Sequence, residues 1–327
     1  MTRVDKSVLI TRQAYPLDLK IELTKALINK FYKRMKGKVY VAFSGGKDST
    51  VLLHIVRSLY PDVSVVFVNT GLQYPEIRDF VKTVPNVTWI RPEMSFYEVI
   101  QKYGYPVISK TQSLYIRQYR HVCNNIKCGI KSKGKYGNEH LRNVRWYGKQ
   151  PGEFYPHPPD DPWWGDKKYK HGRFKISEKW KPLVDAPFKI SEQCCDVLKK
   201  KPFKKYGKKT GEKPILATMA SDSLVRERVY LKAGCNIYEK NKEKSMPMSF
   251  WLEKDVWEYI KKFKLDYAKI YDKGVARTGC IFCMFGIHLE KTNRFEILKE
   301  LHPELYDYCM NKLGIKEVLE YIDSRCS

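Results

Sequence analysis

Residues 39–56 have the sequence VYVAFSGGKDSTVLLHIV. The first five are apolar and include β-branched residues, a composition that predicts a buried parallel strand. The small residues that follow predict a tight turn, and the apolar spacing after position 50 predicts an amphipathic helix. A strand, a turn and a helix in this order place the turn at the carboxyl end of the strand, where open α/β sheets bind their ligands.

The turn between the strand and the helix has the chemistry of a phosphate-binding loop. Glycines at positions 45 and 46 let backbone N–H groups approach an anion, and the helix N-terminus adds partial positive charge. Lys47 can neutralise a phosphate oxygen, and the carboxylate of Asp48 can hold a magnesium ion. Further hydroxyl donors are Ser44, Ser49 and Thr50. The simpler alternative is a turn that needs its glycines for geometry alone.

Residues 44–49, SGGKDS, resemble the SGG-x-DS motif, or PP-loop, of the ATP pyrophosphatase superfamily. The resemblance implies an enzyme that cleaves ATP between the α and β phosphates and adenylates a substrate. It implies catalytic roles for Lys47 and Asp48. It also implies nucleotide contacts from Ser44, Gly45, Gly46, Ser49 and Thr50, with ATP and Mg²⁺ as cofactors.

A second candidate loop, NTGLQYPEI, covers residues 69–77 and follows a strand predicted at residues 63–68. It resembles the DTG-x-x-(F/Y)-PE segment of the phosphoadenylyl-sulfate (PAPS) reductase branch, with Asn69 in place of the usual Asp. The resemblance implies that Asn69, Thr70 and Gly71 contact the nucleotide.

A third motif, Asp222-Ser223-x-x-Arg226, is similar to the (E/D)-S-x-x-R motif of the same family. In that family the arginine faces the nucleotide. The resemblance therefore implies a catalytic role for Arg226 and nucleotide contacts from Asp222 and Ser223.

The chain has nine cysteines, which in a cytoplasmic protein are more often metal ligands or catalytic thiols than disulfides. The Cys-Cys pair at positions 194 and 195 and the later Cys-x-x-Cys resemble the cluster motif of adenylyl-sulfate reductases. The resemblance implies a [4Fe–4S] cluster, and a four-cysteine zinc site is the alternative. The implied ligands are Cys194, Cys195, Cys280 and Cys283. We expect Cys235 and Cys309 to be buried thiols, and the pattern assigns no role to Cys123, Cys128 or Cys326.

The chain is strongly basic, with 61 Lys and Arg against 36 Asp and Glu and a formal net charge of +25. Residues 101–215 alone contain 27 basic and 10 acidic residues. Such an excess attracts polyanions, and aromatic residues interleaved with basic ones suit stacking on bases. The alternatives are a lysine-rich composition that reflects the host genome, and aromatic packing on the protein's own core.

Predicted strands at residues 39–43, 63–68 and 87–90 alternate with helices at residues 17–36, 76–82 and 95–103. The alternation predicts an α/β fold with a doubly wound, mostly parallel sheet, which the resemblance implies is adenine nucleotide alpha hydrolase-like. We expect an elaborated loop region at residues 104–187 with one or two short helices, and a helical pattern at residues 284–327. The predicted segments are a PP-loop half (1–110), a basic insertion (111–188), a part with the cluster cysteines (189–290) and a helical end (291–327).

Our leading hypothesis is an ATP-dependent, iron–sulfur sulfurtransferase that acts on nucleic acid, as in DNA phosphorothioation or tRNA thiolation. It would take sulfur from a donor such as a cysteine desulfurase, and could form a homo-oligomer. Because no apolar run approaches about 20 residues, we expect a cytoplasmic protein with no membrane partner. One alternative is a sulfonucleotide (APS or PAPS) reductase with an atypical tail that ends in Cys326-Ser327. Another is a non-catalytic, nucleotide-sensing regulator that binds nucleic acid.

Overall fold

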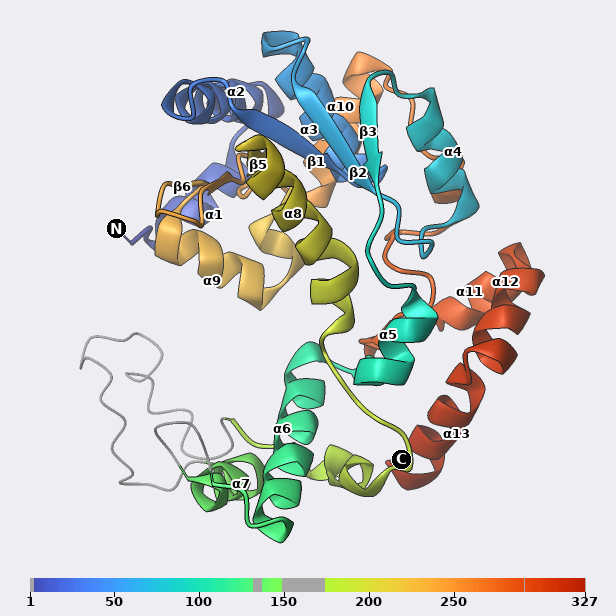
Figure 1. The fold of residues 1–327 in the computed structure, drawn as a ribbon. Coiled ribbons are helices and arrows are strands. Elements are labelled where there is room, and N and C mark those ends of the chain that lie inside the picture. The colour runs from blue at the N-terminus through green and yellow to red at the C-terminus, as the bar shows by residue number, and fades with distance from the viewer. Residues whose placement is uncertain (1–2, 132–136, 149–173, 291, 327) are drawn as a thin grey trace. The chain divides into compact units, whose positions relative to one another are not determined.

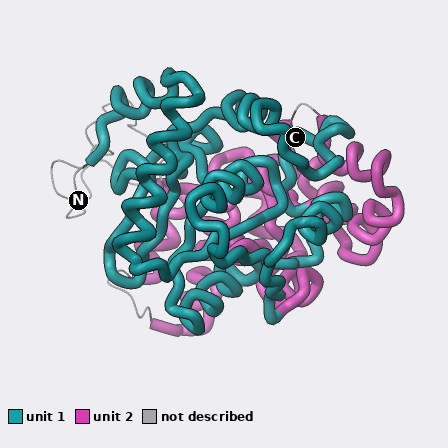
Figure 2. The backbone as a smooth tube through the Cα atoms, turned by 90° about the horizontal axis from the view of Figure 1, so that it is seen from above, with its two compact units in different colours: residues 1–93, 196–280 teal, residues 94–195, 281–327 magenta. Residues whose placement is uncertain are grey.

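The computed structural model describes residues 3–131, 137–148, 174–290 and 292–326 (Figure 1). It contains two compact units, coloured separately in Figure 2. Unit 1 is formed by residues 1–93 and 196–280, and unit 2 by residues 94–195 and 281–327. The units are interleaved along the chain, whereas the four segments predicted from the sequence are consecutive; those segments stay a prediction.

Unit 1 contains a six-stranded sheet in the order β3-β2-β1-β5-β7-β6. All neighbouring strands are parallel except β6 and β7, which are antiparallel. The strands are β1 (Val39–Phe43), β2 (Ser64–Val68), β3 (Val87–Ile90), β5 (Lys213–Ile215), β6 (Asn236–Ile237) and β7 (Lys244–Ser245). The predicted α/β fold with a mostly parallel sheet is therefore confirmed.

Helices cover both faces of this sheet. The ring of Tyr40 packs against Phe203 and Tyr206 of α8 (Lys201–Thr210), and Phe43 packs against Phe80 of α4 (Pro75–Thr83). Because side chains alternate along a strand, Tyr40 and Phe43 point to opposite faces, so α8 and α4 lie on opposite faces. The other helices of unit 1 are α1 (Lys6–Ala14), α2 (Leu17–Arg34), α3 (Lys47–Leu59), η2 (Asp196–Lys200), η3 (Ala220–Asp222), α9 (Leu224–Ala233), α10 (Glu253–Phe263) and η4 (Lys269–Tyr271).

Strand β1 lies in the middle of the sheet and is buried along nearly its whole length. On one side Val41 is in register with Val65 of β2, and on the other with Ile215 of β5. From β1 the chain proceeds to β2 and β3 in one direction, and β5 is added on the other side. The carboxyl end of β1 is therefore a topological switch point, where open α/β sheets have their ligand crevice.

Unit 2 is mainly helical, as predicted for residues 284–327. A two-stranded parallel sheet joins β4 (Val107–Ile108) to β8 (Met284–Phe285). The helices are α5 (Phe96–Tyr103), α6 (Lys110–Lys127), α7 (Asn138–Tyr147), η1 (Glu178–Asp185), η5 (Ile287–Leu289), α11 (Arg294–Leu301), α12 (Pro303–Asp307), η6 (Tyr308–Lys312) and α13 (Ile315–Arg325). Within the described ranges, no helix combines the length and the apolar character needed to cross a bilayer.

The expectation of a loop region at residues 104–187 is wrong for α6, which is 18 residues long. This helix buries only Ser113, Ile116 and Val122, so few apolar residues mark it in the sequence. Tertiary contacts stabilise it instead, among them those that Arg120 makes with the end of η1 and the segment that follows it. The aromatic-rich stretch at residues 155–165 lies outside the described residues.

Candidate nucleotide-binding site

The loop between β1 and α3 requires glycine at position 45. Gly45 has a φ of +73°, and a Cβ there would lie 2.7 Å from Val81 Cγ2 and 2.8 Å from Ile77 Cγ2. Gly46 is the N-cap of α3 and provides no side-chain hydrogen bond to the first turn. Apart from the Lys47 amide, which donates to the Tyr271 hydroxyl, the first amides of α3 are therefore left for other acceptors, as in an anion site at a helix N-terminus.

The three hydroxyl residues of the loop bond mainly within the loop itself. Ser49 Oγ and Thr50 Oγ1 donate to the main-chain oxygen of Gly46, at 2.8 and 3.1 Å. The Ser44 amide donates to Ser49 Oγ at 3.2 Å, and the Gly46 amide donates to Ser44 Oγ at 3.3 Å. These bonds fix the shape of the turn before any ligand binds.

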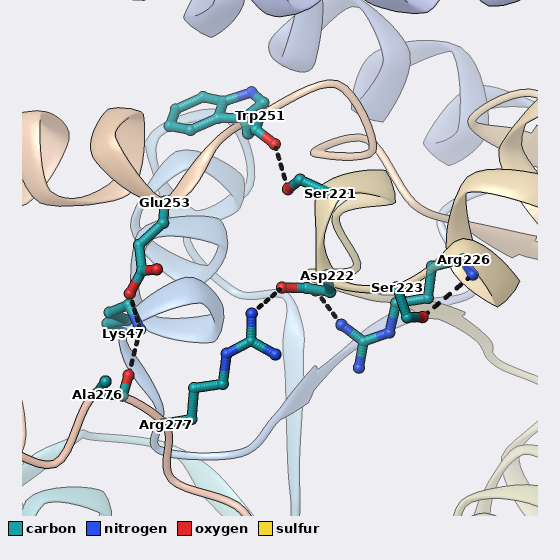
Figure 3. Close-up of polar contacts among 9 residues, drawn as sticks. All are labelled: Lys47, Ser221, Asp222, Ser223, Arg226, Trp251, Glu253, Ala276 and Arg277. Atoms are coloured by element: carbon teal, nitrogen blue, oxygen red, sulfur yellow. Dashed lines mark hydrogen bonds and ion pairs between the residues drawn. The ribbon is translucent and has the colours of Figure 1, made fainter. Parts of the chain in front are cut away.

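Lys47 is buried and is held by residues far away in the sequence. Its Nζ donates to the main-chain oxygen of Ala276 at 2.9 Å and pairs with Glu253 Oε1 at 3.0 Å (Figure 3). Its amide donates to the Tyr271 hydroxyl at 2.9 Å, and that hydroxyl also contacts Thr278 Oγ1 at 2.9 Å. Sequence reasoning missed Glu253, Tyr271 and Ala276, because no local spacing connects them to the loop.

Asp48 carries an unusual buried charge. Burial is the main cause that raises the pKa of Asp48 above the ordinary range of a carboxyl group. The carboxylates of Asp222 and Glu253 raise this pKa further, whereas the positive charges of Lys47 and Arg226 lower it in part. Its Oδ1 is buried and has no hydrogen-bond partner among the described residues. A buried acceptor without a donor is costly, and a bound cation would remove the cost. Carboxylate oxygen is a preferred ligand of Mg²⁺, so Asp48 fits the predicted metal.

A pocket of about 700 Å³ opens over this loop, and all of its lining residues belong to unit 1. They come from the ends of β1 and β2, the segment after β5, the start of α8 and the segment that follows η4. The predicted site residues that line it are Ser44, Gly46, Lys47, Asp48, Ser49, Thr70, Asp222, Arg226 and Cys280. The predicted site residues outside the lining are Gly45, Thr50, Asn69, Gly71, Ser223, Cys194, Cys195 and Cys283.

The lining combines an apolar group with a charged group, as a nucleotide requires. Apolar side chains that suit a nucleobase are Phe43, Phe67, Val68, Leu72, Phe203, Leu216 and Met219. Cationic side chains that suit phosphates are Lys47, Lys199, Lys200, Arg226 and Arg277. Sequence reasoning assigned no site role to Arg277, Lys199 or Lys200, although Arg277 stands directly before the Thr-Gly-Cys of the predicted cluster motif.

Asp222 holds two arginines at the pocket. Its Oδ2 pairs with Arg226 Nη1, and its Oδ1 lies 4.0 Å from Arg277 Nη2 (Figure 3). Ser223 Oγ accepts from the Arg226 amide at 3.3 Å and so caps α9. Asp222 therefore orients two guanidinium groups, whereas Ser223 has a structural role in starting the helix.

The loop after β2 presents Thr70 and Gln73 to the pocket. Thr70 Oγ1 donates to Gln73 Oε1 at 3.1 Å, and Gln73 Nε2 donates to the main-chain oxygen of Val68 at 2.8 Å. Asn69 Oδ1 accepts from the Gly71 amide at 3.1 Å, so the side chain of Asn69 shapes the turn.

The four predicted cluster ligands are divided between the units. Cys194, Cys195 and Cys283 belong to unit 2, and Cys280 belongs to unit 1. The sulfur atoms of Cys194 and Cys195 are 4.0 Å apart. In the ranges that the structure describes, no group of three or more His, Cys, Asp or Glu residues is arranged to hold a metal ion. The cluster therefore stays a prediction.

The other cysteines have separate environments. Cys235 and Cys309 are buried, as predicted, and burial raises the pKa of their thiols to about 11 and about 12. Cys326 is also buried, and burial raises the pKa of its thiol, although Lys179 lowers it in part.

Comparison with known proteins shows the family. The model of the phosphoadenosine phosphosulfate reductase domain matches residues 38–131 and 154–285, so the chain belongs to this family. An adenosine 5'-phosphosulfate reductase of Staphylococcus haemolyticus is 21% identical over 257 residues, which are 77% of this chain and 72% of that protein.

Two uncharacterized proteins of Methanocaldococcus jannaschii are also similar. One is 24% identical over 86% of this chain and 50% of its own length, and the other is 23% identical over 88% of this chain and 43% of its own length. This chain thus spans about half the length of these two relatives. A crystal structure of PAPS reductase from Candida auris, a phosphate complex, aligns over 85% of this chain and 97% of that one, with 14% identity and a TM-score of 0.41.

Proposed function

We propose that unit 1 binds ATP with Mg²⁺ and that the protein is a PP-loop enzyme, which uses the ATP to activate an acceptor for sulfur transfer. The observation that carries the proposal is the buried Oδ1 of Asp48, which has no hydrogen-bond partner among the described residues; Asp48 itself is one of the residues that line a pocket at the N-terminus of α3. The turn, which accepts only glycine at position 45, the N-terminus of α3 and the carboxylate of Asp48 together form one site for phosphate and a metal ion in this proposal.

Each group of lining residues has a role in this proposal. The first amides of α3 and the ammonium of Lys47 bind the β and γ phosphates, and the cation held by Asp48 offsets their charge. Arg226 and Arg277, both oriented by Asp222, contact the remaining phosphate oxygens. The apolar side chains around Phe67 and Leu216 enclose the base. The ammonium of Lys47 must first exchange its contacts with Glu253 and Ala276 for phosphate oxygens.

The proposed reaction has two steps. An oxygen of the acceptor attacks the α-phosphorus, the bond from that phosphorus to the bridging oxygen breaks, and pyrophosphate leaves with the electron pair. A sulfur nucleophile at the oxidation level of hydrosulfide then forms a bond to the activated atom, and AMP leaves with the original oxygen. Neither step needs a redox change, and the predicted cluster is required for neither.

We propose nucleic acid as the acceptor. The net charge of +25 and the excess of lysine and arginine support a polyanionic substrate. Chemical analysis of the product would identify whether the acceptor atom lies in the phosphate backbone or in a base.

The test is conversion of ATP to AMP and pyrophosphate, measured with and without tRNA or duplex DNA. We expect acceptor-stimulated AMP release that falls at least about 100-fold in Lys47→Ala, because the pyrophosphate charge loses a buried cation. The control is Lys30→Ala, an exposed lysine of α2. Lys47→Gln tests the role of the charge with less change in volume, and thermal unfolding checks the fold of each variant. Unchanged turnover in both Lys47 variants would contradict the proposed role of the loop.

A second candidate function is reduction of a sulfonucleotide, which the adenosine 5'-phosphosulfate reductases among the relatives favour. It would yield AMP and sulfite from adenosine 5'-phosphosulfate while a thiol pair is oxidised to a disulfide, with no pyrophosphate formed. One feature favours ATP instead: the loop keeps Lys47, which the resemblance associates with ATP use. Nucleotide binding without either turnover would indicate the non-catalytic regulator.

A further inference from the structure

One strongly charged surface borders the pocket, and most of its residues lie outside the pocket lining. Helices η2 and α8 carry lysines on successive turns, with no acidic residue between positions 197 and 211. The lysines are Lys199, Lys200, Lys201, Lys204, Lys205, Lys208 and Lys209. All of them except Lys199 are exposed. We call the six exposed residues the α8 lysine row.

The row forms one face of a helix whose other face is fixed to the sheet. Positions 201, 204, 205 and 208 follow the i, i+3, i+4, i+7 spacing of a single helix face. On the opposite face, Phe203 and Tyr206 pack against Tyr40 of β1, and the Tyr206 hydroxyl donates to Glu212 Oε2 at 2.8 Å. A rigid element therefore presents the charges in a defined direction.

Few carboxylates neutralise the row. Lys205 pairs with Glu93 at 2.7 Å, but both side chains are 76% exposed, and such pairs contribute little. Lys200 lies 3.7 Å from Asp196. Lys204, Lys208 and Lys209 have no ion pair with any residue that the structure describes. Most of the positive charge of the row is available to an external anion.

The row begins at the nucleotide pocket. Lys199 and Lys200 line the pocket, together with Phe203 from the first turn of α8. At about 1.5 Å per residue, positions 200 to 209 span about 14 Å, a length over which duplex nucleic acid carries about eight phosphate charges. A polyanion on this face would have one end beside the proposed site of ATP activation.

We propose that the α8 lysine row binds the phosphodiester backbone of the nucleic-acid acceptor and leads it to the pocket. The inference rests on the proposed function, because it identifies the surface by which the acceptor reaches the same site. The contact is with phosphates, so the row contributes affinity and position rather than base specificity.

The test measures binding of tRNA and of duplex DNA over a range of salt concentrations, without ATP. Lys204, Lys205 and Lys208 are changed together to Glu, and separately to Gln. The matched control changes Lys30, Lys33 and Arg34 of α2 to Glu; all three are exposed and none lines the pocket. Circular dichroism and thermal unfolding confirm the fold of each variant.

We expect the α8 variants to lose affinity at least about tenfold and to lower the salt slope of binding by about 3, one for each phosphate contact. The α2 control should stay within about twofold. Of tRNA and duplex DNA, the one that binds with the higher affinity is identified as the nucleic acid that the row binds. Wild-type affinity in both α8 variants, or no nucleic-acid binding by the wild-type protein at low salt, would overturn the inference.

Failure of this inference can be distinguished from failure of the proposed function. ATP binding and acceptor-free ATP turnover should be unchanged in the α8 variants, because none of the three lysines lines the pocket. If the row binds nucleic acid but no acceptor stimulates AMP release, the sulfur-transfer proposal fails while the binding surface stands. If AMP release is stimulated equally in the α8 variants and the wild type, the surface assignment fails and the ATP chemistry stands.

Discussion

In unit 2 the guanidinium of Arg120 donates to four main-chain oxygens, whereas in unit 1 the carboxylate of Asp48 keeps one buried oxygen without a hydrogen-bond partner in the described chain. The Arg120 acceptors are Leu183, Val184, Ala186 and Phe188, at 2.6 to 2.8 Å. Both side chains are charged groups that are partly buried, but only Arg120 has all of these contacts supplied by the protein.

The difference separates a charge that the protein satisfies itself from one that the proposed cation would satisfy. A buried polar group that the chain compensates contributes to stability and has no further capacity for a ligand. A buried group that the chain leaves uncompensated costs stability and is retained where a ligand completes it. Two substitutions test this contrast directly, and a third tests the loop that carries Asp48.

Arg120→Met should destabilise the protein by about 3–5 kcal/mol, because several main-chain oxygens lose a charged donor. Urea denaturation measures the change. The control is Lys127→Met on the same helix, where the side chain is exposed and the free energy of unfolding should change by less than about 0.5 kcal/mol. Nucleotide affinity of the folded variant should be unchanged. A loss of less than about 1 kcal/mol would show that Arg120 is not the structural charge that the contacts indicate.

Gly45→Ala should cost about 2–3 kcal/mol and abolish nucleotide binding, because a Cβ at φ +73° would overlap Ile77 and Val81. Gly71→Ala is the matched stability control. Gly71 has the same φ of +73°, but a Cβ there meets nothing within 4 Å, so only the backbone strain of about 1 kcal/mol remains. Denaturation midpoints of the two variants measure the difference. Equal losses would mean that the contact with α4 does not fix the loop.

Asp48→Asn should stabilise the ligand-free protein by about 1 kcal/mol at neutral pH and remove the stabilisation by Mg²⁺ and ATP. Burial raises the pKa of Asp48 in the folded state, so the folded protein holds this proton more tightly than the unfolded chain does. The contribution of this proton to the stability of the folded protein is therefore complete below the ordinary carboxyl pKa. It is lost as the pH rises through the raised pKa of Asp48.

The stabilising effect of Asp48→Asn should accordingly shrink as the pH falls below the ordinary carboxyl range. Thermal unfolding at neutral and acidic pH, each with and without Mg²⁺ and ATP, measures both effects. Asp222→Asn is an informative comparison, since Asp222 already has two arginine partners and its replacement should destabilise. A loss of stability in Asp48→Asn at neutral pH would contradict the assignment of an uncompensated charge.

Much of unit 1 was predictable from the sequence because its signals are local. The strand at residues 39–43, its glycine turn and the helix after it each follow from a few neighbouring residues, and the predicted helix at residues 17–36 appears as α2. The helix α6 was not predictable in the same way. Its buried positions are few and include Ser113, and its stability depends on the contacts that Arg120 makes more than 60 residues away.

Residue type and spacing in the sequence predict the class of fold, the glycine turn after β1 and the place of Lys47, Asp48 and Arg226 in the chain, because they decide backbone conformation and chemistry over short distances. What those side chains contact depends on the tertiary structure. Three sets of contacts join residues that are distant in the chain. Lys47 contacts Glu253 and Ala276, the Tyr271 hydroxyl accepts from the first amide of α3, and Asp222 contacts Arg277 as its second arginine. Such partners are selected by how the strands and helices pack, and no local pattern specifies packing.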